Sequence, residues 1–273
     1  MAALWVVGID EAGRGSLVGE LMIAAFAIED SKESLLKKMG VRDSKELSRG
    51  QREELYSELI KIGVFAVLPI PPKEIDSENI NRLEERRAGD LLKIIFNRLK
   101  GPRAVKAIYI DKFGELRELP RRLRDLGYRG NLVVEPKADS KYAVVSAASI
   151  IAKVIRDRRL DVLRLMYGVR GSGYPADPET VSWVMEVLNK GLRLPIIRYS
   201  WSTLEGTEAF VKKVKSPRKT LEDFMVWGCL APGSGLKVTS LACRACHLQA
   251  TPGCQARAIR GRSGQGRPRP SSG

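Results

Sequence analysis

Two adjacent carboxylates, Asp10 and Glu11, directly follow an apolar run at residues 4–9. The run has the length and the valine and isoleucine content of a buried strand. Because charges do not stay deep in such a strand without partners, we expect both acids at its C-terminal tip, where α/β folds place their sites. Carboxylates in this position suit a hard cation such as Mg²⁺ or Mn²⁺.

An arginine between two glycines, Gly13-Arg14-Gly15, comes next. The glycines let the backbone approach a ligand closely, and the arginine adds a fixed positive charge. With Gly19, the spacing is also similar to a degenerate dinucleotide-binding loop, for which Glu29 or Asp30 would contact a ribose. In that loop the pyrophosphate lies on bare backbone amides, and here the two preceding acids would face it with no cation between. The segment also lacks the Lys-Ser/Thr pair that a Walker-type phosphate-binding loop needs after Gly19. We therefore favour a carboxylate metal site.

Composition narrows the class of protein. The chain has 273 residues, 44% of them hydrophobic, and no uncharged apolar stretch approaches the ~18 residues of a membrane span. The N-terminus lacks the pattern of a secretory signal, so we expect a cytoplasmic protein. A net charge of +15 and a pI of about 9.8 favour a polyanionic partner, with nucleic acid ahead of a membrane surface. A thermophile-like surface rich in charged residues would give a similar composition.

Strands alternate with helices along the chain, which predicts an α/β fold. Ser48 and Gln51 form a capping box at the start of one helix. Further strands are expected at 64–70, 105–110 and 132–134, and helices at 48–62, 79–99, 144–165 and 178–189.

The C-terminal part differs in character. We expect 1–217 to form the folded catalytic unit and 218–273 to be a basic, disordered tail, because residues 224–273 contain 7 basic residues and no acidic one. All four cysteines lie in this tail, at Cys229, Cys243, Cys246 and Cys254. For a zinc site these cysteines offer one CxxC pair, but the outer two are irregularly spaced. Residues 243–247 match the c-type haem attachment pattern, but the sequence shows neither an export signal nor a folded context for haem. We read the cysteines as incidental.

A second strand tip also ends in an acid, Asp111. Carboxylates from neighbouring tips can hold two cations ~4 Å apart, which clamp the attacking and leaving oxygens of a phosphoryl displacement. A fourth acid can come from the long helix, where Asp157 lies on the flank of the apolar stripe and Asp161 nearer its middle. The alternative for either is a solvated charge paired with a neighbouring arginine.

Seven ordered segments now make the chain similar to a known family. They are GIDEAGRG (8–15), DSKEL (43–47), ID (110–111), KADSKY (137–142), SAASIIAK (146–153), RDR (156–158) and GSGYP (171–175). The chain resembles type 2 ribonuclease H (ribonuclease HII) in its archaeal form, over about residues 5–206. The resemblance implies an RNase H-like fold: a central mixed sheet flanked by helices, with a helical C-terminal part.

The resemblance also implies a function. It is cleavage of RNA in RNA–DNA hybrids and on the 5′ side of ribonucleotides embedded in duplex DNA, giving 3′-hydroxyl and 5′-phosphate ends, by a protein expected to be monomeric. The implied catalytic and metal-binding set, holding Mn²⁺ or Mg²⁺, is Asp10, Glu11, Asp111 and Asp157. The implied substrate-binding set is Gly13, Arg14, Gly15, Lys45 and Tyr174.

Two positions depart from the family pattern, since Ser16 and Glu20 stand where proline is usual, and we expect both to loosen the loop. Two rival functions remain open. One is another nuclease of the same fold, such as a junction resolvase, and the other is a nucleic-acid-binding module whose acids hold a structural ion.

Overall fold

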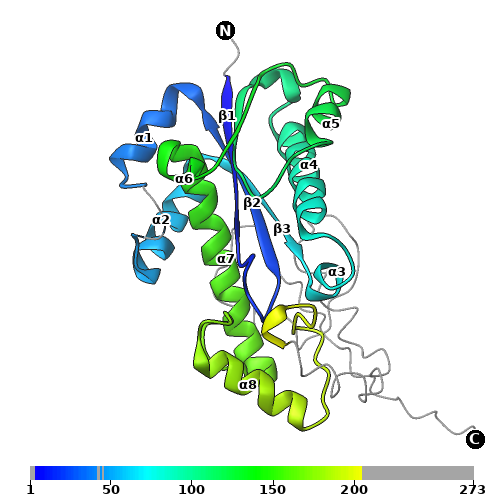
Figure 1. Cartoon of the computed structure of the whole chain (residues 1–273). Helices are drawn as coiled ribbons and strands as arrows, with labels where there is room; N and C mark the ends of the chain where they lie inside the picture. Colours follow the sequence, from blue (N-terminus) through cyan, green and yellow to red (C-terminus); the bar gives the residue numbers. More distant parts are fainter. Residues whose placement is uncertain (1–3, 42–43, 45, 205–273) are drawn as a thin grey trace, which may run out of the picture. The chain divides into compact units, whose positions relative to one another are not determined.

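The computed structural model describes residues 4–41, 44 and 46–204. Its centre is a five-stranded mixed sheet in the order β3-β2-β1-β4-β5 (Figure 1). The pairs β1–β2 and β2–β3 are antiparallel, whereas β1–β4 and β4–β5 are parallel. The strands are β1 (Trp5–Ala12), β2 (Leu21–Glu29), β3 (Val64–Ile70), β4 (Val105–Asp111) and β5 (Asn131–Glu135).

Eight α-helices are described around this sheet. They are α1 (Glu33–Lys38), α2 (Arg49–Ile62), α3 (Pro72–Ile75), α4 (Ile80–Arg98), α5 (Leu119–Asp125), α6 (Ala138–Lys141), α7 (Ala143–Tyr167) and α8 (Pro178–Asn189). Short 3₁₀ turns, η1 (Asp30–Lys32), η2 (Pro102–Ala104) and η3 (Ser202–Leu204), complete the described elements. The mixed sheet flanked by helices confirms the predicted RNase H-like fold. Within the described ranges, no helix is long and apolar enough to cross a membrane.

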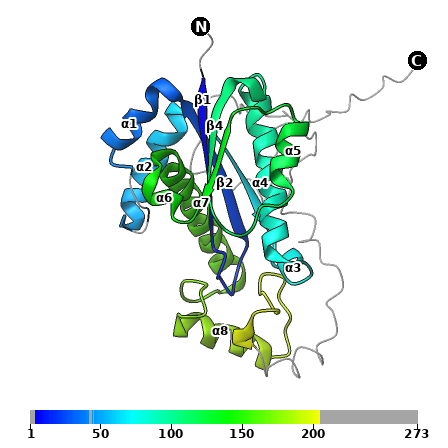
Figure 2. The same ribbon diagram turned by 45° about the horizontal axis from the view of Figure 1, so that its top comes forward.

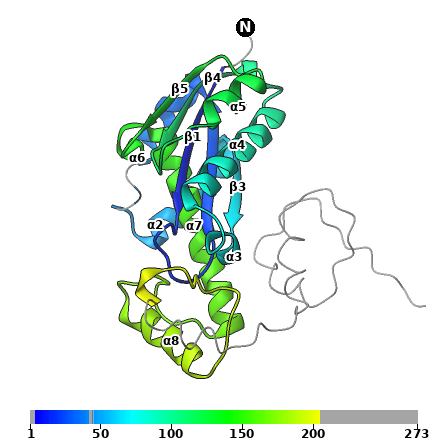
Figure 3. The same cartoon turned by 45° about the vertical axis from the view of Figure 1, so that its right-hand side comes forward.

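Helix α4 covers one face of the sheet and α7 the other, so the sheet separates two apolar cores (Figures 1 and 3). Alternation along β1 assigns its side chains to these cores. Val7 and Ile9 pack with α4, whereas Val6 and Ala12 pack with α7. Asp10 therefore lies on the α7 face, and its neighbour Glu11 on the α4 face.

Helix α7 approaches β1 closely at Gly8. A Cβ atom added to Gly8 would collide with the backbone of Val144 and Val145. The helix is buried along most of its length, and Ile150 and Ile151 have no exposed surface. Burial of each such side chain contributes about 1.5–3 kcal/mol, which fixes the axis of α7 over the strand tips.

A third apolar cluster joins the far end of α7 to α8 and to the segment before residue 204 (Figure 2). Leu17 and Val18, from the loop after β1, belong to this cluster and are fully buried. Val18 also forms an isolated antiparallel bridge with Ile197. The loop that follows the acidic tip of β1 is therefore anchored to the α8 region through Leu17 and Val18.

The predicted elements agree with the structure where periodicity was strong. Ser48 caps α2 with the expected capping box, and α8 spans the expected 178–189. Strand β2 was not predicted, because its nine residues are almost wholly buried and show no alternation of apolar and polar residues. The short helices α1, α3, α5 and α6 were not predicted either. The predicted boundary at 217, the tail and its four cysteines lie outside the described residues.

Candidate active site

Asp10 and Asp111 lie side by side at the tips of two parallel strands. Ile9 is paired with Ile110 across β1 and β4, and the two aspartates are the next residues of each strand. A third acid, Asp139, joins them, and ligand oxygens of all three lie within 4.8 Å of one another. Asp10 and Asp139 are buried, and Asp111 is partly exposed. Three converging carboxylates of this kind could hold a metal ion.

Asp139 reaches this group through the turn after β5. That strand ends beside β4, with Glu135 paired to Asp111. Lys137 then adopts a left-handed conformation with φ of 58°, and the four-residue helix α6 begins. The backbone N–H of Ala138 donates a hydrogen bond of 2.9 Å to Asp111 Oδ1. The Asp111 carboxylate thus positions Ala138, the residue that immediately precedes Asp139.

Sequence reasoning missed Asp139 as a site residue. The segment 137–142 carried the family resemblance, yet the acid within it was given no role. The strand-tip argument that selected Asp10 and Asp111 applies equally to β5, the third parallel strand. The predicted end of β5 at 134 was only five residues before Asp139. This acid could therefore have been found by extending the same reasoning to the third tip.

The buried position of Asp10 disfavours its charge. Burial raises the pKa of Asp10 well above its ordinary value, and the neighbouring charge of Glu11 raises it further. A hydrogen bond with Ser149 of α7 acts in the opposite direction. The backbone N–H of Glu11 also donates to Asp10 Oδ1 at 2.8 Å. A divalent cation would supply the compensation that these few donors do not.

Glu11 faces α4 and meets a different set of charges. Burial raises the pKa of Glu11, the hydrogen bond with Asp10 lowers it, and the charges of Glu84 and Asp111 raise it. Arg14 lowers it again. Its Oε2 atom is buried and has no hydrogen-bond partner among the described residues. The Glu11 carboxylate is thus next to the acidic group but outside the three that converge within 4.8 Å.

Asp157 and Asp161 lie elsewhere on α7, paired with arginines. Asp157 accepts from Arg52 at 3.2 Å and from Arg156 at 3.4 Å. Asp161 is 42% exposed and pairs with Arg49 and Arg164. Among the described residues, neither belongs to the converging acidic group. Both helix acids are therefore paired with arginines in the structure, which was the alternative to a metal-binding role for each.

The loop after β1 is held from inside by two buried arginines. Arg198 has no exposed surface and donates to the carbonyl oxygens of Arg14 at 2.7 Å and Gly19 at 3.1 Å. Arg156 of α7 lies against Gly13, where an added Cβ would come within 2.9 Å of its Nε atom. Gly13 has a φ of 88°, a conformation that glycine adopts without strain. Glycine is therefore required at position 13 both for its positive φ and for the close approach of Arg156.

Tyr174 is brought to the same loop. Gly173, beside it, accepts hydrogen bonds from the backbone of Leu17 at 2.7 Å and Val18 at 3.1 Å. The Arg156 guanidinium lies 4.4 Å from the centre of the half-buried Tyr174 ring. The structure therefore brings together the predicted Gly13-Arg14-Gly15 loop and Tyr174, with Arg156 between them. Lys45, the remaining predicted substrate contact, lies outside the described residues.

Two family departures strengthen this loop, where the sequence analysis expected them to loosen it. Ser16 is fully buried, and its hydroxyl lies within hydrogen-bond distance of Val18 O at 2.8 Å and Gly173 O at 2.9 Å. It also accepts from Arg156 at 3.1 Å. Glu20 pairs with Arg159 of α7 at 2.5 Å. A proline at either position could make none of these contacts.

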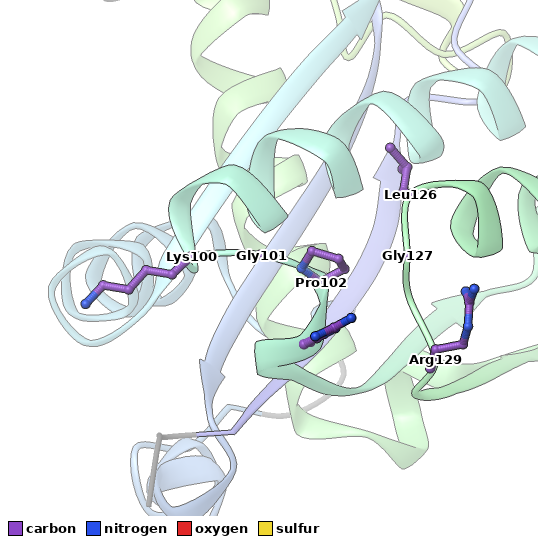
Figure 4. Close-up of a pocket in the computed structure, with 7 residues that line it drawn as sticks. Lys100, Gly101, Pro102, Leu126, Gly127 and Arg129 are labelled. Atoms are coloured by element: carbon purple, nitrogen blue, oxygen red, sulfur yellow. The ribbon is translucent and has the colours of Figure 1, made fainter.

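A separate hollow lies at the opposite end of β4. Its volume is about 360 Å³, and its lining includes Pro102, Gly127 and Arg129 (Figure 4). Pro102 belongs to the turn that precedes β4, whereas the acids follow the end of that strand. This hollow is therefore not part of the acidic site.

A mixed five-stranded sheet with acids at adjacent strand tips that could hold a metal ion is typical of the RNase H-like class. Comparison with known proteins narrows the class. The family model for ribonuclease HII matches residues 7–204. A ribonuclease HII of Aeropyrum pernix is 48% identical over 222 residues, which cover 81% of this chain and 98% of the relative.

Solved structures agree. The crystal structure of ribonuclease H2 from Pyrococcus horikoshii matches with a TM-score of 0.66 and 39% identity, covering 77% of this chain and all of that one. A Bst-RNase HIII solved with Mn²⁺ matches with a TM-score of 0.63 but 20% identity, covering 77% of this chain and 71% of that one, and it shows the fold alone. This chain belongs to the ribonuclease HII family, and it is a metal-dependent endoribonuclease of the ribonuclease H type.

Proposed function

We propose that the chain cleaves the RNA strand of RNA–DNA hybrids and cuts on the 5′ side of ribonucleotides embedded in duplex DNA. The observation that carries this proposal is the convergence of Asp10, Asp111 and Asp139, next to a glycine loop that is fixed against Tyr174. The products would carry 3′-hydroxyl and 5′-phosphate ends. We also propose that the cleaving species is a monomer.

The metal ligands in this proposal are Asp10, Glu11, Asp111 and Asp139, with Asp139 in place of the predicted Asp157. Four carboxylates offer the hard oxygen donors that Mg²⁺ and Mn²⁺ take. The raised pKa of the buried Asp10 supports this assignment, because a carboxyl in that state lacks a countercharge. Two bound divalent ions would activate water and stabilise the departing oxygen. The protein's part is to fix the acids on rigid strand tips.

Discrimination of RNA from DNA falls to the loop in this proposal. The 2′-hydroxyl is the group that separates the two at a given site, and backbone groups of Gly13-Arg14-Gly15 can meet it at hydrogen-bond range. Tyr174 would pack on the neighbouring deoxyribose, on the ring face that Arg156 leaves open. The hydrogen bonds that the backbone of Leu17 and Val18 donates to Gly173 support a fixed spacing between the two contacts.

One substrate set tests the activity. The full chain is incubated with Mg²⁺ or Mn²⁺ and an end-labelled duplex carrying a single ribonucleotide, with an all-DNA duplex and a four-way junction in parallel. We expect one cut, 5′ to the ribonucleotide, in the first substrate alone. Cleavage of the junction would indicate a resolvase, and binding without cleavage of any substrate would indicate a nucleic-acid-binding module.

Paired variants test the ligand set. Asp139→Asn should abolish cleavage while duplex binding persists, because a ligand charge is lost with little change in volume. Asp157→Asn, on α7 and paired with Arg52 and Arg156, should keep measurable cleavage. The opposite ranking of the two variants would return Asp157 to the ligand set and remove Asp139.

A further inference from the structure

The side chain of Arg14 points into the protein. Its Nη1 donates to the carbonyl oxygen of Phe113 and its Nη2 to Asn81 Oδ1. Its Nε lies 3.5 Å from Glu84 Oε1, with the arginine side chain 35% exposed and the glutamate fully buried. All three guanidinium nitrogens thus have a partner. Asn81 and Glu84 are one turn apart on α4, and Phe113 follows the acidic tip of β4.

Glu84 is poorly compensated for a buried acid. Neither of its carboxylate oxygens has a hydrogen-bond partner among the described residues, and Arg14 is its ion-pair contact there. Burial raises the pKa of Glu84 to about 8, against the opposing charges of Arg14 and Arg198. A buried polar group in this condition costs stability, and an apolar residue of similar volume would not.

The neighbouring Glu85 shows what a structural acid on this helix looks like. It is also buried, but its Oε1 accepts hydrogen bonds from the backbone of Glu118 at 2.6 Å and Leu119 at 2.7 Å. Those bonds satisfy the start of α5. The Glu84 carboxylate accepts no hydrogen bond from the backbone of the described residues, and the ion pair it makes there is with Arg14 of the Gly13-Arg14-Gly15 loop.

We propose that Asn81 and Glu84 are positioning residues, which act through the Arg14 guanidinium to hold the glycine loop in register with the acidic strand tips. This rests on the proposed function, in which that loop meets the 2′-hydroxyl. Glycines flank Arg14, so the backbone there has little stiffness of its own. Anchoring the one long side chain of the loop therefore restrains the loop, in addition to the hydrogen bond that Arg198 donates to the Arg14 carbonyl oxygen.

The proposal predicts a loss of activity without a loss of stability. In Glu84→Leu the ion pair with Arg14 is lost but the volume is filled, so the guanidinium keeps only its bonds to Phe113 and Asn81 and the loop should shift relative to the acids. Misplacement of a contact by about 1 Å can cost up to ~100-fold in rate, and we expect a fall in kcat/KM of at least about tenfold. The midpoint of thermal unfolding should stay level or rise, because the unsatisfied buried carboxyl is removed and the partly exposed Arg14 keeps two other partners. Glu84→Gln keeps an oxygen facing Arg14 Nε–H and should stay within about threefold of wild type, since a polar contact to the guanidinium is retained.

The experiment measures kcat/KM on the single-ribonucleotide duplex, the Mn²⁺ concentration for half-maximal rate, and the thermal midpoint. Glu85→Leu is the matched control, expected to lower the midpoint and keep kcat/KM when assayed well below it. Asn81→Ala and Asn81→Asp form a second pair, with loss and retention of the oxygen acceptor. We expect the losses in Glu84→Leu and Asn81→Ala to leave the Mn²⁺ requirement unchanged.

Three results would overturn the positioning role: wild-type kcat/KM in Glu84→Leu and Asn81→Ala; equal defects in Glu84→Gln and Glu84→Leu; or a midpoint in Glu84→Leu as low as in Glu85→Leu. If Glu84→Leu does not fold, the Asn81 pair decides. The proposed function fails separately, because it requires that the wild-type chain cleave this substrate.

Discussion

Substituting Asp10 by Asn should stabilise the metal-free protein and weaken its response to metal. In the folded state Asp10, Asp111 and Asp139 converge within 4.8 Å. At that separation a fully ionised pair repels by about 3.5 kcal/mol if the effective dielectric constant is about 20. Asp10 avoids part of this cost by holding its proton, as its raised pKa indicates. We therefore expect a smaller gain, about 2 kcal/mol near pH 8, which for a chain of this size moves the thermal midpoint by about 4–8 °C.

The sign of the pH dependence follows from the direction of the pKa shift. A raised pKa means that the folded state keeps a proton which the unfolded state has already released. Stability of the wild-type protein is then lost as pH rises from the ordinary aspartate value through the folded pKa. The amide that Asp10→Asn introduces does not titrate. The advantage of this variant over wild type should therefore be small near pH 4, grow as pH rises, and level off above the folded pKa.

Bound metal should make wild type more stable than Asp10→Asn, which reverses their order in EDTA. A ligand that binds only the folded state at 100 times its Kd adds about 2.7 kcal/mol. Wild type should gain this from Mn²⁺ and Asp10→Asn should gain much less. The assay is thermal unfolding in EDTA and in Mn²⁺, with Asp161→Asn as the control, since that exposed acid pairs with Arg49 and Arg164. A variant less stable than wild type in EDTA, or one with a full metal shift, would refute the reasoning.

Four further outcomes are expected. Because burial raises the pKa of Glu84 from 4.5 to about 8, stability in EDTA should fall more steeply with rising pH across that interval in wild type than in Glu84→Gln, in which Asp10 still titrates, and the difference in unfolding free energy should be at most roughly 5 kcal/mol. Gly8→Ala should unfold the protein or lower its thermal midpoint sharply, because the new methyl group collides with the α7 backbone at Val144. Tyr174→Ala should weaken cleavage at a single ribonucleotide by about 1–3 kcal/mol in kcat/KM through lost sugar packing, and equal rates would remove that role. Truncation after residue 217 should keep cleavage but lower duplex affinity at low salt, with affinities converging at high salt in a titration, because the 7 basic residues at 224–273 are removed.

Local patterns predicted the elements that carry their own signals. The capping box at Ser48 and the apolar periodicity of 79–99 and 144–165 gave α2, α4 and α7 within a few residues. Strand β2 gave no such signal, because both of its faces are buried and its alternation is erased. The order of the strands was likewise beyond reach, since pairing between β1 and β4 joins residues about a hundred positions apart.

The site was predictable where it lies on a strand tip and not where it depends on tertiary contacts. Asp10 and Asp111 were selected correctly as neighbours, because parallel strands end at one edge of a sheet. Periodicity placed Asp157 on the flank of the α7 stripe, but it could not show that Arg52 from α2 would pair with it. The inward direction of Arg14 was also hidden, because its partners come from α4 and from the turn after β4.

The direction of each pKa shift separates two kinds of charge in this fold. Burial opposes the charge of Asp161, yet hydrogen bonds from Arg49 and Arg164 lower its pKa, so that carboxylate stabilises the folded state as an anion. At Asp10 and Glu84 burial outweighs the compensation and raises the pKa, so each charge costs stability. Burial likewise lowers the pKa of Arg198, which holds the loop, to about 10. A chain selected for stability alone would replace such groups with apolar ones. Such groups lie around one loop and three strand tips, and their catalytic function best explains why they are retained there. The two apolar cores on either side of the sheet supply the stability that these groups cost.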